Sequence, residues 1–146
     1  MTELVLAVFR ANGAFLAAGD ALVADLGLTS ARWQVLGAVS LAGRPLTVAQ
    51  AARRMGLTRQ AVQRVANDLA AIGLVAYEDN PDHKRAKLIR LTDRGEAVYA
   101  EADRRQIAWA RGLAEGLSDA EVERALALVR RLEGRAEPEA GDDPET

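Results

Sequence analysis

Apolar residues recur in pairs three or four positions apart along the first 26 residues of the chain. This spacing predicts one long amphipathic helix over about residues 2–26, and Gly27 marks its end. A second helix follows, in which Trp33, Leu36 and Val39 share an inward face. The chain is therefore predicted to open with a long helix and a shorter one.

The next segment has the pattern of two short helices joined by a tight turn. Thr47-Val-Ala-Gln50 is a capping-box sequence, and it opens a helix that ends at about Met55. Gly56 forms the break, and Thr58 caps a further helix whose inner face carries Val62, Val65, Leu69 and Ile72. Two short helices around a turn that contains glycine indicate a helix-turn-helix.

Beyond this motif the hydrophobic period changes from helix to strand. Residues 74–78 and 86–91 form short extended runs, separated by the polar, proline-containing segment 79–85. They predict a two-stranded hairpin with a mobile basic tip. Thr92 then caps a long helix over about 93–115, and a second capping box opens a last helix that extends to about residue 134.

Residues 135–146 contain no apolar residue larger than alanine, and we predict that they form a disordered acidic tail. The 146 residues fit one domain, here residues 1–134, and a chain of this length folds without disulfides or a metal.

The composition excludes most catalytic chemistry. Cysteine is absent, so the chain has no disulfide, thiolate nucleophile or cysteine-based metal site, and the single histidine, His83, excludes a metal site with two histidines. No glycine-rich phosphate loop is present. We therefore expect no enzyme activity, no cofactor and no metal, and we interpret His83 as an exposed, incidental residue.

Because Arg10 interrupts the apolar N-terminus before a signal-peptide pattern develops, we expect a cytoplasmic protein.

The small net charge of −2 hides a strong asymmetry along the chain. Residues 44–94 carry ten basic and five acidic side chains, a net charge of +5, whereas the rest of the chain carries nine basic and sixteen acidic ones, a net charge of −7. Because a binding partner responds to the local field, the basic middle of the chain favours a polyanion such as nucleic acid.

Four strings of sequence resemble the MarR (multiple antibiotic resistance regulator) family of winged helix-turn-helix transcription factors. They are Leu28-Thr-Ser-Ala-Arg-Trp-Gln-Val-Leu36, Leu46-Thr-Val-Ala-Gln-Ala-Ala-Arg-Arg-Met-Gly-Leu-Thr58, Leu69-Ala-Ala-Ile-Gly-Leu-Val75 and Asn80-Pro-Asp-His-Lys-Arg-Ala-Lys-Leu-Ile-Arg-Leu-Thr-Asp-Arg-Gly95. The match covers about Leu4 to Leu132. Four strings in family order are far more specific than one helix-turn-helix string alone.

The resemblance implies a mostly α fold with a small two- to three-stranded β wing. The winged helix-turn-helix would span about residues 30–95, and helices over about 2–26 and 93–134 would form the dimerisation region of a homodimer. The function implied is that of a sequence-specific DNA-binding regulator, a repressor that a small aromatic or anionic ligand releases. The family's usual Asp-x-Arg in the wing is Asp82-x-Lys84 here, and lysine cannot reproduce a bidentate pairing with a carboxylate.

The predicted recognition helix has a polar face without an acidic residue until Asp68. An ordinary solvated face would mix glutamate with lysine, whereas arginine suits guanine and glutamine or asparagine suits adenine in the major groove. The predicted DNA-contacting residues of this helix are Thr58, Arg59, Gln60, Gln63, Arg64 and Asn67.

Three further groups of residues complete the predicted sites. Lys84, Arg85 and Lys87 in the hairpin are candidate DNA contacts, and Arg53 and Arg54 are candidate phosphate contacts or simply solvated residues. Phe15 and Trp33 are first of all packing residues, with an effector pocket as the sharper alternative. The main alternative function is a helical dimeric protein-interaction module whose helix-turn-helix no longer binds DNA.

Overall fold

The computed structural model describes residues 1–136, which form six α-helices, one 3-10 helix and three strands. In chain order the elements are α1 (Thr2–Val23), η1 (Ala24–Leu26), α2 (Ser30–Ser40), β1 (Leu46–Thr47), α3 (Val48–Met55), α4 (Arg59–Ala71), β2 (Val75–Glu78), β3 (Leu88–Leu91), α5 (Asp93–Leu113) and α6 (Asp119–Ala136). The contacts divide the chain into two compact units, Met1–Ala108 and a second that begins at Trp109. The mostly helical fold with a small β wing is confirmed.

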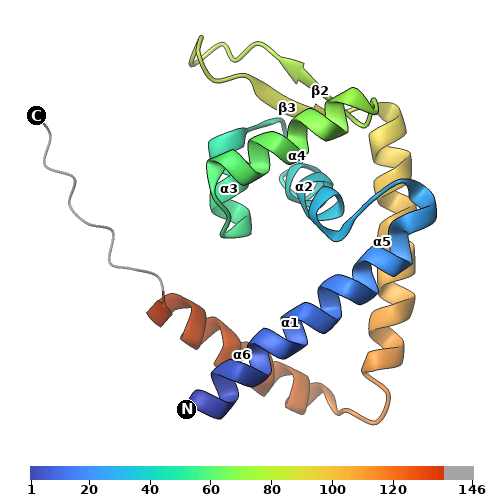
Figure 1. Ribbon diagram of the computed structural model, residues 1–146, viewed down its shortest axis with the longest axis vertical. Helices are drawn as coiled ribbons and strands as arrows, with labels where there is room; N and C mark the ends of the chain where they lie inside the picture. Colours follow the sequence, from blue (N-terminus) through green and yellow to red (C-terminus); the bar gives the residue numbers. More distant parts are fainter. Residues whose placement is uncertain (137–146) are drawn as a thin grey trace, which may run out of the picture. The chain divides into compact units, whose positions relative to one another are not determined.

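The core of the first unit lies between α2, α3, α4 and the sheet. Its largest fully buried side chains include Leu36 of α2, Leu46 of β1, Leu69 of α4 and Ile89 of β3. Burial of each such side chain contributes about 1.5–3 kcal/mol relative to an exposed position. Figure 1 shows α4 lying across α2, with the β2–β3 hairpin extending past α4.

The three strands form an antiparallel sheet in the order β1-β3-β2. β2 and β3 pair in register from Val75 opposite Leu91 to Glu78 opposite Leu88. The third strand, β1, has only two residues, with Leu46 opposite Ile89. A strand of two residues has no alternation to detect, which is why the hydrophobic pattern predicts only the hairpin.

Most of the predicted caps are confirmed. The Thr47 side chain accepts a hydrogen bond from the Gln50 backbone N–H, and the Gln50 side chain accepts one from Thr47, a complete capping box. Thr58 accepts from the Ala61 N–H and caps α4. Gly56 adopts a left-handed φ of 61° at the turn between α3 and α4, a conformation that strongly favours glycine.

The end of the last helix differs from the prediction. α6 continues to Ala136, two residues beyond the predicted end at Gly134. A glycine costs a helix only about 1 kcal/mol relative to alanine, so it does not force a stop. The remainder of the predicted acidic tail, residues 137–146, lies outside the described residues.

Two hydrogen bonds join α1 to Ser30 at the start of α2. The Ser30 N–H donates to Asp20 Oδ1 at 2.6 Å, and the Ser30 hydroxyl donates to the Leu16 carbonyl at 2.8 Å. Gly19 lies against Ser30 and leaves no room for a side chain. By length and composition alone, residues 2–26 would also be apolar enough to cross a membrane, a test that core helices and signal sequences pass as well.

A second junction joins the end of α4 to the start of α5. The Thr92 hydroxyl donates to the Gly73 carbonyl at 2.8 Å and accepts from the Gly95 N–H at 3.0 Å. The Thr92 N–H donates to the Leu74 carbonyl at 3.1 Å, and Arg94 donates to the Ile72 carbonyl at 2.9 Å. The backbone carbonyls that follow α4 are therefore satisfied by the first turn of α5 and the residue before it.

An ion pair holds η1 against α5 within the first unit. Arg105 donates to both carboxylate oxygens of Asp25, at 2.5 and 2.9 Å, and to the Leu22 carbonyl at 3.0 Å. These hydrogen bonds from Arg105 lower the pKa of Asp25 below its ordinary value of 3.8. Glu101, one turn earlier on α5, accepts from Arg105 Nε at 2.7 Å and keeps the guanidinium in place.

Gly95 should tolerate no side chain. A methyl group there would overlap the Leu74 carbonyl oxygen, which belongs to the backbone and cannot move aside cheaply. We expect Gly95→Ala to lower the free energy of unfolding by roughly 3 kcal/mol or more, measured by chemical denaturation. Gly112→Ala, on the same helix with open space around it, is the matched control and should be neutral or slightly stabilising. Equal stability of the two variants would contradict this account of the junction.

The Asp25–Arg105 pair predicts a pH dependence of stability. Because the folded-state pKa of Asp25 is depressed, its contribution to stability is present above pH 3.8 and is lost as the pH falls through the lowered value. Asp25→Asn should lower the melting temperature at pH 7. The difference in melting temperature between this variant and the unsubstituted protein should become smaller as the pH is lowered from 5 to 3. A difference that stays constant over this range would show that the charge of Asp25 is not the cause.

Candidate nucleic-acid interface

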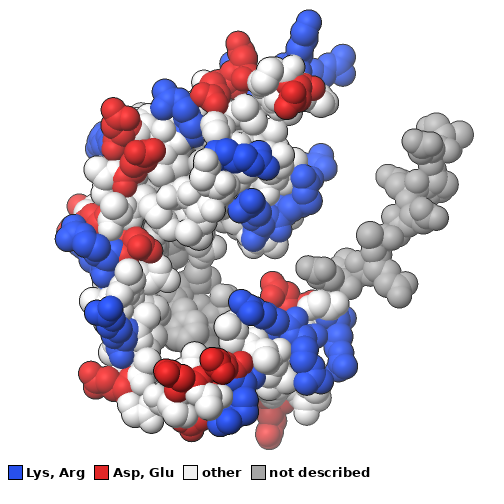
Figure 2. All heavy atoms as spheres, turned by 180° about the vertical axis from the view of Figure 1, so that it is seen from behind, with Lys and Arg blue, Asp and Glu red and all other residues white. Residues whose placement is uncertain are grey.

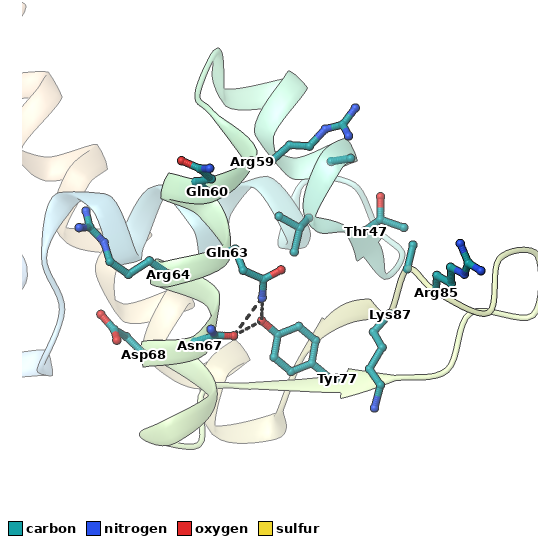
Figure 3. Close-up of a pocket in the computed structure, with 13 residues that line it drawn as sticks. Thr47, Arg59, Gln60, Gln63, Arg64, Asn67, Asp68, Tyr77, Arg85 and Lys87 are labelled. Atoms are coloured by element: carbon teal, nitrogen blue, oxygen red, sulfur yellow. Dashed lines mark hydrogen bonds between the residues drawn. The ribbon is translucent and has the colours of Figure 1, made fainter. Parts of the chain in front are cut away.

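A groove of about 1040 Å³ lies between α4 and the β2–β3 hairpin. Figure 3 shows α4 forming one wall, with Arg85 and Lys87 coming from the hairpin on the other side. The residues that line it are Thr47, Val48, Ala49, Arg59, Gln60, Gln63, Arg64, Asn67, Asp68, Tyr77, Arg85, Ala86 and Lys87.

The polar face of α4 faces this groove because its apolar face is fixed in the core. Val62, Ala66 and Leu69 are buried, so the positions between them face outward. The predicted recognition residues on α4 all line the groove: Arg59, Gln60, Gln63, Arg64 and Asn67. Thr58 is the exposed N-cap of the same helix, where its hydroxyl is already engaged with the Ala61 N–H.

The hairpin contributes two of its three predicted cations to the groove. Arg85 and Lys87 line it, whereas Lys84 is exposed and lies outside its lining. The tip is organised by Asn80, whose side chain accepts from the Asp82 N–H at 3.0 Å. Within residues 1–136, no ion pair joins Asp82 to Lys84 or Arg85, so the hairpin is not braced by the carboxylate–guanidinium pair of the family pattern. Arg85 is thus available to the groove.

Basic side chains also gather outside the groove. Arg53 and Arg54 are exposed in the last turn of α3 and do not line the groove. Seen from behind, Lys and Arg side chains project from the hairpin and from the side of the first unit that carries α3 and α4 (Figure 2).

Asp68 is the one acidic residue in the lining of the groove. Arg32 of α2 lies 3.7 Å from its carboxylate and also donates to the Gly27 carbonyl at 3.2 Å. Part of the negative charge at this end of α4 is therefore compensated from the neighbouring helix.

Tyr77 of β2 also lines the groove, and the sequence pattern alone does not single it out. Its hydroxyl donates to Asn67 Oδ1 and accepts from Gln63 Nε2, both at 2.8 Å, and Gln63 Nε2 also donates to Asn67 Oδ1 at 3.0 Å (Figure 3). Burial raises the pKa of the Tyr77 phenol above its ordinary value of 10.0, although the hydrogen bond from Gln63 opposes the rise. The phenol therefore keeps its proton at neutral pH. In the sequence, the feature that points to Tyr77 is an aromatic residue in the first strand of the predicted hairpin.

The two candidate effector residues lie elsewhere. Trp33 is half-buried on α2, close to Gly19 of α1, and Phe15 is exposed on α1. Neither lines the groove between α4 and the hairpin. An effector pocket at these residues stays a prediction.

Two comparisons of sequence place the chain in a family. The sequence pattern of the MarR family matches residues 26–86. The uncharacterized protein Rv2011c of Mycobacterium tuberculosis is 42% identical over 132 residues, which cover 90% of this chain and 91% of that protein. The chain belongs to the MarR family.

Solved structures of MarR-type regulators share its fold. The transcriptional regulator PcaV from Streptomyces coelicolor, solved in complex with its natural ligand, is 27% identical with a TM-score of 0.79, over 89% of this chain and 91% of PcaV. A mutant MarR from E. coli, solved with operator DNA, is 21% identical with a TM-score of 0.81, over 89% of this chain and 93% of that chain. The fold is thus the winged helix-turn-helix of the MarR family, a family of transcription regulators that is generally not enzymatic.

Proposed function

We propose that this MarR-family protein is a homodimeric, sequence-specific DNA-binding regulator of transcription, a cytoplasmic repressor that a small-molecule ligand releases. The observation that carries the proposal is the groove in which the amide and guanidinium groups of α4 face the cations of the hairpin. An α-helix fits the major groove, and arginine, glutamine and asparagine have the donors and acceptors that read base edges there.

The two walls of the groove would have different tasks. On α4, Arg59, Gln60, Gln63, Arg64 and Asn67 face outward and would contact base edges or phosphates, next to the Thr58 cap. On the hairpin, Arg85 and Lys87 would contact phosphate or enter the minor groove, and Lys84 would add charge at the tip. Arg53 and Arg54 are exposed on α3, within the same basic part of the chain, and would contact the backbone.

The exposed apolar surface of the helices at both ends of the chain supports a homodimer. α6 has no buried residue, yet Val122, Leu126 and Val129 form an apolar stripe along it at helical spacing. On α1 only Gly19 and Val23 are buried, and Phe9 is 66% exposed. Exposed stripes of this kind mark interfaces, and an obligate dimer typically buries about 2,000 Å² of accessible surface or more.

A two-fold symmetric dimer needs a DNA site of the same symmetry. We expect an approximately palindromic operator whose half-site centres lie about 34–36 Å apart, one turn of the duplex. For the effector, Phe15 and Trp33 remain the candidate pocket residues. A ligand that prefers the conformation unable to bind DNA by about 1–3 kcal/mol is enough to release it.

The second candidate function is a dimeric interaction module without DNA binding. The cations of the hairpin speak against it, because a surface that binds only protein has no need to align Arg85 and Lys87 with the amides of α4. A gel shift with DNA from the protein's own locus, at two salt concentrations, separates the two functions. A salt-dependent, competitor-resistant complex supports the regulator, and no complex at either concentration favours the module.

The dimer can be tested at α6. In sedimentation at micromolar concentration the unsubstituted protein should have twice the chain mass of 15.6 kDa. Leu126→Glu combined with Val129→Glu places two charges on the exposed stripe and should abolish the dimer, because an apolar interface would have to bury them. The chain should still fold, because neither side chain is buried in its core. Arg124→Glu, on another face of α6, is the control and should leave the dimer intact. A folded monomer of the unsubstituted protein would contradict the proposal.

The two walls of the groove should respond differently to substitution. Arg64→Ala, if the arginine holds a base edge, should cost about 1–3 kcal/mol per contact and flatten the preference at one position of each half-site. Arg85→Ala should weaken binding to the specific and to the scrambled duplex alike, because it removes a phosphate contact. The slope of log K against the logarithm of the salt concentration should fall in magnitude by about one per subunit. Both are measured by salt titration of binding to the two duplexes.

The control for charge alone is Arg104→Ala, which removes an exposed cation of α5 that pairs with Glu101. It should leave both the base preference and the salt slope unchanged. If Arg85→Ala behaves like this control, the hairpin is not a DNA-binding wing, and the interaction module becomes the better function.

A further inference from the structure

Gln63, Asn67 and Tyr77 form a closed triangle of hydrogen bonds in the groove. The two amides lie one turn apart on α4, and the phenol comes from β2 across the groove wall. All three side-chain contacts are between 2.8 and 3.0 Å, a range typical of well-formed hydrogen bonds. Figure 3 shows the three side chains converging on the Tyr77 oxygen.

The triangle uses one end of each amide and leaves the other end free. The NH₂ group of Gln63 donates to Tyr77 and Asn67, so the free atom of Gln63 is its carbonyl oxygen, an acceptor. The carbonyl oxygen of Asn67 accepts from both partners, so the free group of Asn67 is its NH₂, a donor. If both amides were turned over, the hydroxyl could close the same triangle, and again one donor and one acceptor would remain.

This division changes which bases the amides can read. A bidentate contact to adenine needs the oxygen and the nitrogen of one amide together. Here neither amide has both ends available while the triangle stands. We propose that Tyr77 is a specificity-determining positioning residue, which holds Gln63 and Asn67 so that they read DNA as one acceptor and one donor on separate amides. This inference rests on the proposed DNA-binding function and deepens it.

The chemistry of the free ends predicts the base classes. An acceptor from Gln63 suits the amino group of adenine or cytosine, and a donor from Asn67 suits guanine, adenine N7 or thymine O4. The two amides lie one helical turn apart on α4, and their engaged ends meet in a hydrogen bond of 3.0 Å, so the two side chains lie next to each other. Their free ends therefore reach the same base pair or two adjacent ones.

The position of Tyr77 suits a holding role. Tyr77 pairs with Ile89 in the register of β2 and β3, and Ile89 is fully buried, so the strand that carries the phenol is anchored in the core. The raised pKa of the phenol keeps it neutral, with a proton to donate to Asn67. The ring is only half-buried, so loss of the hydroxyl alone leaves its packing in place.

The experiment compares base preference in the full-length protein and in Tyr77→Phe. Each protein selects sites from a library of randomised duplexes, and its affinity is then measured on the site chosen by the unsubstituted protein and on a scrambled duplex. Tyr99→Phe is the matched control, because the chain has two tyrosines and Tyr99 lies on α5 near Gly37, outside the lining of the groove. Thermal unfolding of each variant verifies that it is folded.

We expect Tyr77→Phe to bind the scrambled duplex as before and to lose about threefold to tenfold in affinity per half-site, the range for one hydrogen bond, which is roughly tenfold to a hundredfold for a site with two half-sites. The loss should fall on the one or two base pairs that Gln63→Ala and Asn67→Ala also affect. In the double variant Gln63→Ala/Asn67→Ala, adding Tyr77→Phe should change nothing further, because the residues act as one unit. Tyr99→Phe should match the unsubstituted protein throughout.

Each remaining outcome overturns the inference. An unchanged base preference in Tyr77→Phe, or an equal loss on selected and scrambled duplexes, would show that the phenol does not position the amides. Effects of Gln63→Ala and Asn67→Ala on base pairs that are neither shared nor adjacent would show two independent contacts, whatever Tyr77→Phe does. If the unsubstituted protein selects no sequence at all, it is the proposed function that fails, and this inference falls with it.

Discussion

The arrangement of the first unit depends on how the carbonyl groups that follow α4 are satisfied. The residues around the start of α5 supply the partners: Thr92 bonds to Gly73 and Leu74, and Arg94 bonds to Ile72. Gly95 brings the helix close enough for these bonds to form, since any side chain there would overlap the Leu74 backbone. The end of α4 and the start of the hairpin are thus both joined to the start of α5 at one point.

Each wall of the groove is held by contacts of its own in addition to this junction. α4 is held by its buried apolar face, and the hairpin is held by the pairing of β2 with β3 and by the short strand β1. Polar side chains can then be aligned across the groove at little further cost in conformational entropy. Tyr77 makes direct use of this, because a phenol on the wing meets two amides of the helix at hydrogen-bonding distance.

The charge and the apolar surface of the chain are divided between different elements. The basic side chains concentrate in residues 44–94, which include the helix-turn-helix and the hairpin, although the whole chain is slightly acidic. The exposed apolar side chains concentrate on α1 and α6 instead. A surface that favours a polyanion and a surface that is poorly solvated therefore lie on separate elements of the chain.

The sequence by itself determined the local features of this protein. Capping at Thr47 and Thr58, the turn at Gly56, the hairpin and the outward face of α4 all depend on residues within a few positions of one another, where helix and strand periodicity apply. The two-residue strand β1, the overlap that excludes a side chain at Gly95, and the triangle of Gln63, Asn67 and Tyr77 were decided only by the tertiary structure. Each of these features joins residues that lie ten or more positions apart in the chain, and hydrophobic period carries no information about which atoms meet across such a separation. The same reason explains why the sequence identified Gln63 and Asn67 as exposed amides but not which end of each remains free.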